Sequence, residues 1–306
     1  MTTRNPRTIL LVPHTYRAGN ITAAARASEL LTEAGIEVRL LDQQKMGPVE
    51  DEPALKALER VEEGPEAAAG CELVLVLGGD GTFLRAASFA HAQDVPVLGI
   101  NLGHVGFLAE WEQESMEEAI GRVIDRTYRI EDRMTIDVTL LDSEDNVLGC
   151  GWALNEASIE NVNRTKVMDA TLEVDLRPVS TFGCDGVLIS TPTGSTAYAF
   201  AAGGPVMWPE VEALLVVPNN AHALFTKPLV VSPRSTVAIE SESNTEEANV
   251  VLDGFRSLEM PPGSRVEIVR GRRPVRWVRL DDHPFTDRLV HKFQLPVSGW
   301  RGPANK

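Results

Sequence analysis

The stretch that most constrains the fold of this chain runs from Leu73 to Thr82. Its first five residues are apolar (Leu-Val-Leu-Val-Leu), and they lead directly into the Gly-Gly-Asp-Gly segment of residues 78–81. A short apolar run that ends in glycines is typical of a buried strand in a parallel sheet. A helix is expected from Phe83 to Ala92, and the free N–H groups at its start would suit a phosphate. The stretch therefore predicts an α/β domain with a ligand site at this turn.

Asp80 is an unusual residue for a turn that is expected to face phosphate. Because a carboxylate repels phosphate, Asp80 would act there as a base or as a ligand of a cation that accompanies the phosphate. The surrounding glycines permit positive φ angles and a close approach of the backbone. In the alternative interpretation the turn is structural, and Asp80 caps the helix. The stretch alone leaves both interpretations open.

Composition limits the classes of function. The chain has 306 residues, about the length of two domains, and its 29 basic and 44 acidic residues give a net charge of −15. This charge argues against nonspecific binding to nucleic acid or to an anionic membrane. Three widely spaced cysteines indicate reduced thiols and no structural zinc. No apolar run reaches the roughly 20 residues of a membrane span. We therefore expect a cytoplasmic protein without a nucleic-acid or membrane partner.

The first part of the chain alternates strands and helices. Helices are expected from an Asn20 cap to Ala34, with Gly35 as the stop, and after Ser115 as far as Asp125. The acidic, alanine-rich segment 50–66 is expected to be a solvated helix and connector. The strands, besides the one that ends at Leu77, are expected at Thr8–Val12, Val38–Leu41 and Val97–Ile100. This alternation predicts a doubly wound, mostly parallel sheet.

The pattern changes near Tyr128, where polar and apolar residues begin to alternate. Such period-2 segments, separated by turn residues, indicate antiparallel strands, and they predict an all-β, sandwich-like domain. They are residues 133–141, 171–176, 236–240, 265–269 and 275–280. Helical spacing returns from Phe285 to Phe293. The predicted domains are therefore residues 1–128, completed by 285–306, and residues 129–284.

Common nucleotide-binding motifs are absent from the sequence. There is no P-loop, and the partial Gly-x-Gly-x-x-Gly that starts at Gly79 has Leu84 in place of its third glycine. A second glycine-containing segment, Asn101–Leu108, follows the strand that ends at Ile100. Because ligands bind at the carboxyl ends of parallel strands, the loops at 78–82 and 101–106 could line one cleft. They could equally be two independent turns.

Two polar segments in the second half are candidate ligand contacts. Asn155 and Glu156 interrupt a mostly apolar strand, and their donors and acceptors would suit an adenine edge or ribose hydroxyls. A hydrogen bond at the end of a strand would explain them equally well. The nearby segment Asn163–Lys166 would be a phosphate contact or a solvated turn.

The most specific motif is the hydroxyl-rich segment Thr191-Pro-Thr-Gly-Ser-Thr-Ala-Tyr198, which follows a strand and precedes Gly203-Gly-Pro205. Hydroxyls and free N–H groups would converge there, and Tyr198 offers an aromatic face to a base. We interpret the segment as a nucleotide-binding loop, because a structural turn would not need four hydroxyls around one glycine.

Taken in order, these four motifs resemble those of the NAD kinase family, and the match extends over nearly the whole chain. Asn219–Leu229 and Asp253-Gly254 also fit, and the sequence is most similar to actinobacterial members. The resemblance implies transfer of a phosphoryl group from ATP, or from polyphosphate, to the 2′-hydroxyl of the adenosine ribose of NAD, which makes NADP. It also implies a divalent metal ion, most commonly Mg²⁺, an active site between the two domains, and a homodimer or homotetramer.

The resemblance also assigns roles to residues. Asp80 would be the general base, since a carboxylate within hydrogen-bond reach can accept the hydroxyl proton. The remaining positions would bind substrate. Gly78, Gly79, Gly81 and Thr82 would form the phosphate-side loop, with Arg85 as a further phosphate contact; Asn155 and Glu156 would hold NAD hydroxyls or base atoms; Thr196, Ala197 and Tyr198 would frame the adenine; Ser195 and Ala201 would be further substrate-binding residues; Lys166 and Asp185 would contact NAD, possibly that of a neighbouring subunit.

Two positions depart from common family residues. Phe255 stands where many members have Gln, and Gly183 stands where some have a basic residue. A lipid or sugar kinase would share only the Gly-Gly-Asp-Gly segment, and a non-catalytic NAD(P) sensor would gain little from Asp80. Both functions remain as alternatives to an NAD kinase.

Overall fold

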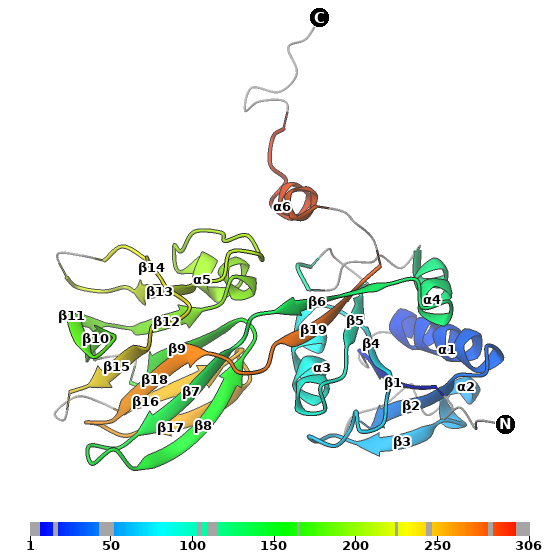
Figure 1. The fold of residues 1–306 in the computed structure, drawn as a ribbon, viewed down its shortest axis with the longest axis horizontal. Helices are drawn as coiled ribbons and strands as arrows, with labels where there is room; N and C mark the ends of the chain where they lie inside the picture. The colour runs from blue at the N-terminus through cyan, green and yellow to red at the C-terminus, as the bar shows by residue number, and fades with distance from the viewer. Residues whose placement is uncertain are drawn as a thin grey trace, which may run out of the picture. The chain divides into compact units, whose positions relative to one another are not determined.

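The computed structural model describes residues 7–14, 18–42, 52–102, 106–108, 115–163, 166–223, 226–242, 247–280 and 284–297. The chain forms two compact units (Figure 1). The first comprises residues 1–132 and 275–306, and the second comprises residues 133–274. Within the described part of the chain, none of the helices combines the length and hydropathy that a membrane span requires.

The first unit is built on a seven-stranded sheet in the order β3-β2-β1-β4-β5-β19-β6. Its neighbouring strands from β3 to β19 run parallel. The strands are β1 (Thr8–Pro13), β2 (Glu37–Asp42), β3 (Glu59–Glu62), β4 (Leu73–Leu77), β5 (Val97–Ile100), β6 (Arg129–Arg133) and β19 (Val275–Arg279). The helices are α1 (Ala18–Glu33), α2 (Pro53–Lys56), α3 (Asp80–Ala92), α4 (Met116–Ile124) and α6 (Phe285–Phe293).

Helices cover both faces of this sheet, with α1 and α4 on one face and α3 on the other (Figure 1). All five residues of β4 are buried, which explains its continuous apolar sequence. Its odd-numbered residues, such as Leu75, pack with side chains of α1 and α4 in one core cluster. On the other face, the ring of Phe83 of α3 packs against that of Trp277 of β19 at a tilt of 46°, with 5.2 Å between ring centroids. The predicted doubly wound domain is confirmed.

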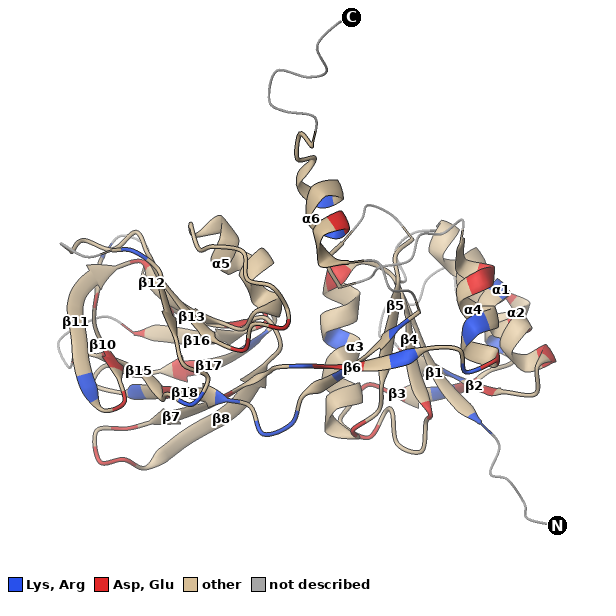
Figure 2. Ribbon diagram, turned by 45° about the horizontal axis from the view of Figure 1, so that its top comes forward, with Lys and Arg blue, Asp and Glu red and all other residues tan. Residues whose placement is uncertain are grey.

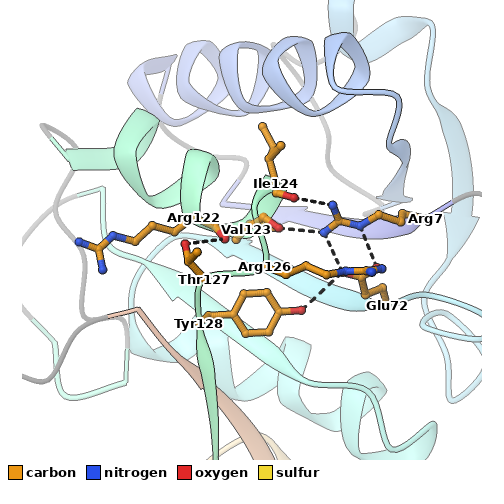
Figure 3. A network of polar contacts seen from close by, with 8 residues as sticks. All are labelled: Arg7, Glu72, Arg122, Val123, Ile124, Arg126, Thr127 and Tyr128. Carbon is orange, nitrogen blue, oxygen red and sulfur yellow. Dashed lines mark hydrogen bonds and ion pairs between the residues drawn. The ribbon is translucent and has the colours of Figure 1, made fainter.

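An ion-pair network fixes the C-terminal end of α4 to the amino ends of strands β1 and β4 (Figure 3). The guanidinium of Arg7, next to β1, forms two hydrogen bonds of 2.8 and 2.9 Å with the carboxylate of Glu72, next to β4. It also donates to the carbonyls of Val123 and Ile124 at 2.8 and 2.7 Å. Arg126 binds Glu72 from the other side. The Val123 carbonyl also accepts the backbone N–H of Arg126, so Arg7 adds a second donor to it and supplies one to Ile124 in the last turn of α4.

The second unit contains two six-stranded antiparallel sheets with a shared core. One has the order β11-β10-β15-β18-β7-β8, and the other has the order β14-β13-β12-β9-β16-β17. The strands are β7 (Ile136–Leu141), β8 (Val147–Ala153), β9 (Glu156–Asn161), β10 (Met168–Val174), β11 (Arg177–Cys184), β12 (Gly186–Ser190), β13 (Leu214–Asn219), β14 (Leu229–Val231), β15 (Val237–Ser241), β16 (Ala248–Leu252), β17 (Arg256–Met260) and β18 (Arg265–Arg270). Two short helices follow β12, the 3₁₀ helix η3 (Thr193–Thr196) and α5 (Tyr198–Ala201).

Alternate residues of these strands face the core, as in β7, where Ile136, Val138 and Leu140 are buried and their neighbours are half-buried. The predicted all-β domain is therefore confirmed. Charged residues of both signs are interspersed over the two units (Figure 2). The net charge of −15 is thus spread along the chain.

Three elements differ from the sequence-based expectations. β19, expected among the antiparallel strands, joins the first sheet and pairs in parallel with β5 through Trp277 and Val97. In the segment expected as a helix at 50–66, the described residues 52–66 contain only the one-turn helix α2 and the edge strand β3, where Arg39 of β2 binds Glu59. α1 begins at Ala18, so Asn20 lies inside its first turn and is not the cap. The left-handed Gly35 does follow its end, with φ +75°.

Candidate active site

The carboxylate of Asp80 is held at the carboxyl edge of the parallel sheet. β1, β4 and β5 end together there, since Pro13 pairs with Leu77 and Leu77 pairs with Ile100. The Asp80 carboxylate accepts hydrogen bonds from the backbone N–H groups of Phe107 (3.1 Å) and Leu108 (3.0 Å). The two glycine segments therefore meet at Asp80, although residues 103–105 lie outside the described part of the chain.

The helix cap is Gly79, and Asp80 is the first residue of α3. The carboxylate accepts N–H groups from the 101–108 segment, so the interpretation of Asp80 as the helix cap is wrong. A Cβ atom on Gly106 would lie 2.1 Å from Oδ1 of Asp80, so only glycine allows the carboxylate this close to the second loop.

The three glycines of the 78–81 turn have different surroundings: Gly78 is in close contact with Thr82, whereas Gly79 and Gly81 are not closely packed. None of the three has a positive φ, contrary to one of the reasons for which they were expected. A Cβ on Gly78 would lie 2.9 Å from Oγ1 of Thr82, so this position requires a glycine. Gly79 and Gly81 have no described atom within 4 Å of an added Cβ. Their bare backbone at the start of α3 leaves room for an anion.

Arg85 lies on a different face of α3 from Asp80. Five residues separate the two, which corresponds to about 140° around the helix axis. The guanidinium of Arg85 forms an ion pair with Glu63, in which Nε donates to Oε1 at 2.7 Å. A phosphate would have to compete with Glu63 for this side chain.

The resemblance implies a divalent metal ion. The described residues contain no group of three or more His, Cys, Asp or Glu side chains placed to hold one. Mg²⁺ usually keeps several waters and is bound by one or two carboxylates together with phosphates of the substrate. Asp80 supplies a carboxylate, each oxygen of which accepts an N–H group. A carboxylate of this kind fits a Mg²⁺ ion that takes its other ligands from water and from the phosphates of a nucleotide.

Asn155 and Glu156 form a second polar centre, at the start of β9. Each side chain is only 6% exposed. Oδ1 of Asn155 and Oε2 of Glu156 are buried without a hydrogen-bond partner among the described residues. A buried polar atom without a partner is costly, so these two oxygens are candidates for a hydrogen bond to a group outside the described residues.

Glu156 is poised to carry a proton. Burial, and then the negative charge of Asp253, raise the pKa of its carboxyl to about 8, although the backbone N–H of Tyr198 opposes this shift. Glu160 adds a smaller effect in the same direction. At neutral pH the carboxyl is mainly protonated, and it can both donate and accept a hydrogen bond.

The hydroxyls of the 191–196 loop hold the loop in shape. Oγ1 of Thr191 donates to the carbonyl of Leu154 at 2.5 Å and accepts the N–H of Gly194. The hydroxyl of Ser195 donates to the carbonyl of Pro192 at 2.7 Å and accepts the N–H of Met207 at 2.8 Å. The argument that four hydroxyls exceed the needs of a turn is therefore wrong for these two. The hydroxyls tie the loop to itself and to the Asn155 segment.

Gly194 allows the loop to press against the Asn155 backbone. A Cβ there would lie 2.0 Å from the carbonyl oxygen of Asn155. The N–H of Thr191 donates to that same oxygen at 2.9 Å. The Thr191–Tyr198 loop is thus anchored beside Asn155 and Glu156, with Thr196, Ala197 and Ala201 only partly buried or exposed.

Lys166 and Asp185 lie near the opposite end of β9 from Glu156. The side-chain amide of Asn161, the last residue of β9, donates to the carbonyl of Lys166 at 2.7 Å, and its backbone N–H donates to the carbonyl of Asp185. Five residues of strand separate Glu156 from Asn161, which corresponds to about 16 Å. Lys166 and Asp185 therefore do not join Asn155 and Glu156 in a single cluster.

Tyr198 makes hydrogen bonds toward both ends of β9, the Glu156 end and the end near Asp185. Its backbone N–H donates to Glu156, and its hydroxyl accepts the side-chain amide of Asn219 at 3.4 Å. Asn219 pairs with Gly186, the residue after Asp185. The ring of Tyr198 is 40% exposed. It offers a flat aromatic surface between the Glu156 end and the Asp185 end of the sheet.

Sequence reasoning missed the groups that orient these side chains. The N–H groups of Phe107 and Leu108 have no sequence signature, because any residue supplies a backbone N–H. The carboxylate of Asp253 accepts the N–H groups of Leu154 (3.0 Å) and Asn155 (2.6 Å), almost one hundred positions away. Asp253 was matched only as part of an Asp-Gly pair, and its long-range contact could not be read from that pair.

Comparison with known proteins supports one family for both halves of the chain. The ATP-NAD kinase N-terminal domain matches residues 9–128, and the ATP-NAD kinase C-terminal domain matches residues 154–280. An NAD kinase of Corynebacterium efficiens is 69% identical over 303 residues, which cover 99% of this chain and 95% of that protein. An NAD kinase of Rhodococcus opacus is 59% identical, with coverage of 97% and 95%.

Solved structures agree with this assignment. Yeast NADH kinase complexed with NADH superposes with a TM-score of 0.85 over 99% of this chain and 91% of that chain, and at 20% identity it supports the fold alone. An NAD kinase from Archaeoglobus fulgidus in complex with ATP gives a TM-score of 0.69 at 25% identity, over 95% and 98% of the two chains. The two domain matches and the full-length similarity to actinobacterial relatives show that the chain belongs to the NAD kinase family.

Proposed function

We propose that the protein transfers the terminal phosphoryl group of ATP to the 2′-hydroxyl of the adenosine ribose of NAD, with Asp80 as the general base. The observation that carries this proposal is the Asp80 carboxylate, which two backbone N–H groups hold at the carboxyl edge of a parallel sheet. Ligands of open α/β sheets bind at this edge. A lipid or sugar kinase is disfavoured, because both halves of the chain match the ATP-NAD kinase domains.

Asp80 would receive the proton of the attacking hydroxyl. Phosphoryl transfer depends mainly on positioning and on stabilisation of charge, with one group to accept this proton. The N–H groups of Phe107 and Leu108 fix the direction of the carboxylate, so that the hydroxyl oxygen would lie about 2.6–3.2 Å from it. The backbone of Gly79 and Gly81, at the start of α3, would face the phosphates. A bound Mg²⁺ would neutralise charge on those phosphates.

The polar centre of the second unit would bind NAD. Oδ1 of Asn155 and Oε2 of Glu156 are buried oxygens without a partner in the described part of the chain, and they suit an amino group and a hydroxyl of the dinucleotide. The exposed ring of Tyr198 would stack on a base, with Thr196 and Ala197 beside it. Ser195 supports this surface from within the loop, because its buried hydroxyl is used in the hydrogen bonds of the loop.

We also propose that the active form is a homodimer or homotetramer. Lys166 and Asp185 lie about 16 Å along the strand from Glu156, too far to join that cluster directly. Their proposed contact with NAD would then be made to the NAD of a neighbouring subunit. Light scattering after size-exclusion chromatography would measure the mass. A monomer at assay concentration would contradict this part of the proposal.

The activity is tested with purified protein, NAD, ATP and Mg²⁺. NADP should form, and coupling to glucose-6-phosphate dehydrogenase would report it. Replacing ATP with polyphosphate identifies the phosphoryl donor. NADP binding measured by calorimetry, combined with no turnover on either donor, would favour a sensor and would overturn the proposed activity.

Asp80→Asn tests the role of Asp80 directly. The amide cannot accept the hydroxyl proton, so kcat should fall by about 10²–10⁴-fold while the Kd for NAD changes little. Steady-state kinetics and calorimetry measure the two effects. Asp42→Asn, at a half-exposed carboxylate of the same unit, is the matched control and should leave kcat unchanged. A near-normal kcat in Asp80→Asn would remove Asp80 from the role of base.

A further inference from the structure

The turn between β16 and β17 places a carboxylate inside the second unit. Asp253 and Gly254 both have positive φ, 51° and 74°, and the N–H of Phe255 donates to the carbonyl of Leu252. Two consecutive residues of this kind form the tight hairpin turn for which Asp-Gly is a preferred sequence. The turn explains the residue type, but it does not require the side chain to be buried.

The burial of this carboxylate distinguishes it from its counterpart in a similar turn. Asp175, between β10 and β11, also begins a pair of positive-φ residues, but it is exposed and accepts hydrogen bonds from Ser235 and Thr236 nearby. The Asp253 side chain is only 1% exposed. Its two oxygens accept the N–H groups of Leu154 and Asn155, and its own N–H donates to the carbonyl of Glu156. Asp253 thus binds three consecutive residues of the site.

Arg256 holds the carboxylate from the other side. Its Nη2 donates to Oδ2 of Asp253 at 2.7 Å. Its guanidinium lies 4.7 Å from the ring centroid of Trp152 and 4.8 Å from that of Phe255. The position that departs from the common family residue therefore supplies an aromatic face to Arg256. Such stacking favours arginine over lysine.

We propose that Asp253, which Arg256 holds in place, is a positioning residue for NAD binding; this inference rests on the proposed function. Asp253 fixes the backbone of Leu154–Glu156 and sets the charge state of Glu156. In this arrangement Asp253 does not touch the substrate. It acts through the two side chains whose buried oxygens have no partner among the described residues.

The proposed effect of Asp253 on the charge state of Glu156 follows from the groups that surround the Glu156 carboxyl. These are Asp253 from the β16–β17 turn, Glu160 from β9 and the N–H of Tyr198 from α5. Burial raises the pKa of the Asp253 carboxyl too, but the N–H groups of Leu154 and Asn155 and the guanidinium of Arg256 oppose this shift. For Glu156 the N–H of Tyr198 is the one opposing group that contributes, so we place the proton of the pair on Glu156. Removal of the negative charge at Asp253 should therefore lower the pKa of Glu156.

The experiment measures the Kd for NAD by calorimetry from pH 6 to pH 9.5 in the absence of a phosphoryl donor. In the unmodified protein the Kd should change across a midpoint near pH 8, where Glu156 titrates. Glu156→Gln should abolish this midpoint, which assigns it. Asp253→Asn should move the midpoint to lower pH by about one unit and weaken NAD binding about tenfold to a hundredfold, because the amide has one oxygen and one of the two buried N–H groups loses its acceptor.

Matched variants separate this role from a general effect on the turn. Asp175→Asn changes the same residue at the corresponding turn position and should move neither the midpoint nor the Kd. Arg256→Lys keeps the positive charge without the stacked fork, so it should keep the midpoint and raise the Kd. Asp253→Ser, a smaller uncharged side chain, should repeat the shift if Asp253→Asn does not fold.

The outcomes distinguish the two proposals. If the midpoint of the pH dependence of the Kd is unchanged in the folded Asp253 variants, the proposed positioning role of Asp253 is overturned. A shift of equal size in Asp175→Asn would also overturn it. Protein that binds NAD with the expected pH dependence but forms no NADP supports the positioning role and overturns the proposed activity. Absence of NAD binding in the unmodified protein overturns both.

Discussion

Individual residues at this site are constrained mainly by contacts that are distant in sequence. Asp80 is held by backbone N–H groups 27 and 28 residues away. Gly106 is required because a Cβ would meet the Asp80 carboxylate. In the second unit, Glu156 owes its raised pKa to burial and to Asp253. The residue types at these positions indicated the chemistry, whereas the contacts decided the orientation of each group and the raised pKa of Glu156.

Gly106→Ala is predicted to reduce catalysis through Asp80. The added methyl group would displace a carboxylate from a position 2.1 Å away, and kcat should fall by about ten- to a hundredfold. Steady-state kinetics, with the Kd for NAD measured in parallel, would test this. Gly121→Ala is the control, because Gly121 lies within α4 with open space around it. That variant should raise stability by about 0.5–1 kcal/mol with kcat unchanged. Equal kcat values for both variants would contradict the assignment.

Single elements are placed by polar anchors as well as by their apolar faces. The C-terminal turn of α4 is fixed by Arg7 and Glu72 (Figure 3). Burial disfavours the charge on Glu72, yet hydrogen bonds from Arg126 and Arg7 outweigh this effect and lower the pKa of the carboxyl from 4.5 to about 2. Arg126 adopts a positive φ of 55° at the end of the helix, where glycine is more common. Its contact with Glu72 offsets the strain.

This pKa predicts an acid-sensitive contribution to stability. A folded-state pKa below the unfolded value stabilises the protein above about pH 4.5, and the contribution is lost as the pH falls toward 2. At full size it amounts to about 2–3 kcal/mol. Urea unfolding between pH 6 and pH 3 should therefore show a smaller pH dependence in Glu72→Gln than in the unmodified protein. Glu117→Gln, at an exposed ion pair with Arg26, should leave the pH dependence unaltered. Equal slopes for all three proteins would contradict the assignment.

At the scale of the whole molecule, the first unit is assembled from both ends of the chain. β19 lies at Val275–Arg279, beyond all strands of the second unit, and it pairs with β5. Trp277 is 2% exposed and packs against Phe83 of α3. The terminal helix α6 contacts the same unit, because Phe285 and Phe293 lie 6.1 and 5.6 Å from the ring of Phe107. The stability of the Asp80 site therefore depends on residues almost 200 positions away.

Trp277→Ala is predicted to destabilise the first unit selectively. The loss of a buried aromatic side chain should cost about 3–5 kcal/mol. Hydrogen exchange should rise in β1, β4 and β5 while the strands of the second unit keep their protection. Trp208→Ala removes a partly exposed ring, 43% exposed, and should change stability much less. Equal loss of protection in both units would show that they unfold together.

The sequence by itself determined the fold class, the catalytic carboxylate candidate and most of the elements. Local patterns carry this information, since a continuous apolar strand such as β4 and the period-2 strand β7 differ in how many of their faces are buried. The helix from Phe285 to Phe293 was expected at the bounds that the structure gives.

Only the tertiary structure decided which unit each strand joins and what each polar group contacts. β19 alternates polar and apolar residues like the antiparallel strands, yet it pairs in parallel with β5, because pairing depends on partners distant in sequence. The hydroxyls of Thr191 and Ser195 resembled ligand donors, but they are used within the fold. The clamp of Asp253 and Arg256 on Asn155 joins two turns about 100 residues apart. No local pattern specifies such a contact, since chain folding alone brings the two segments together.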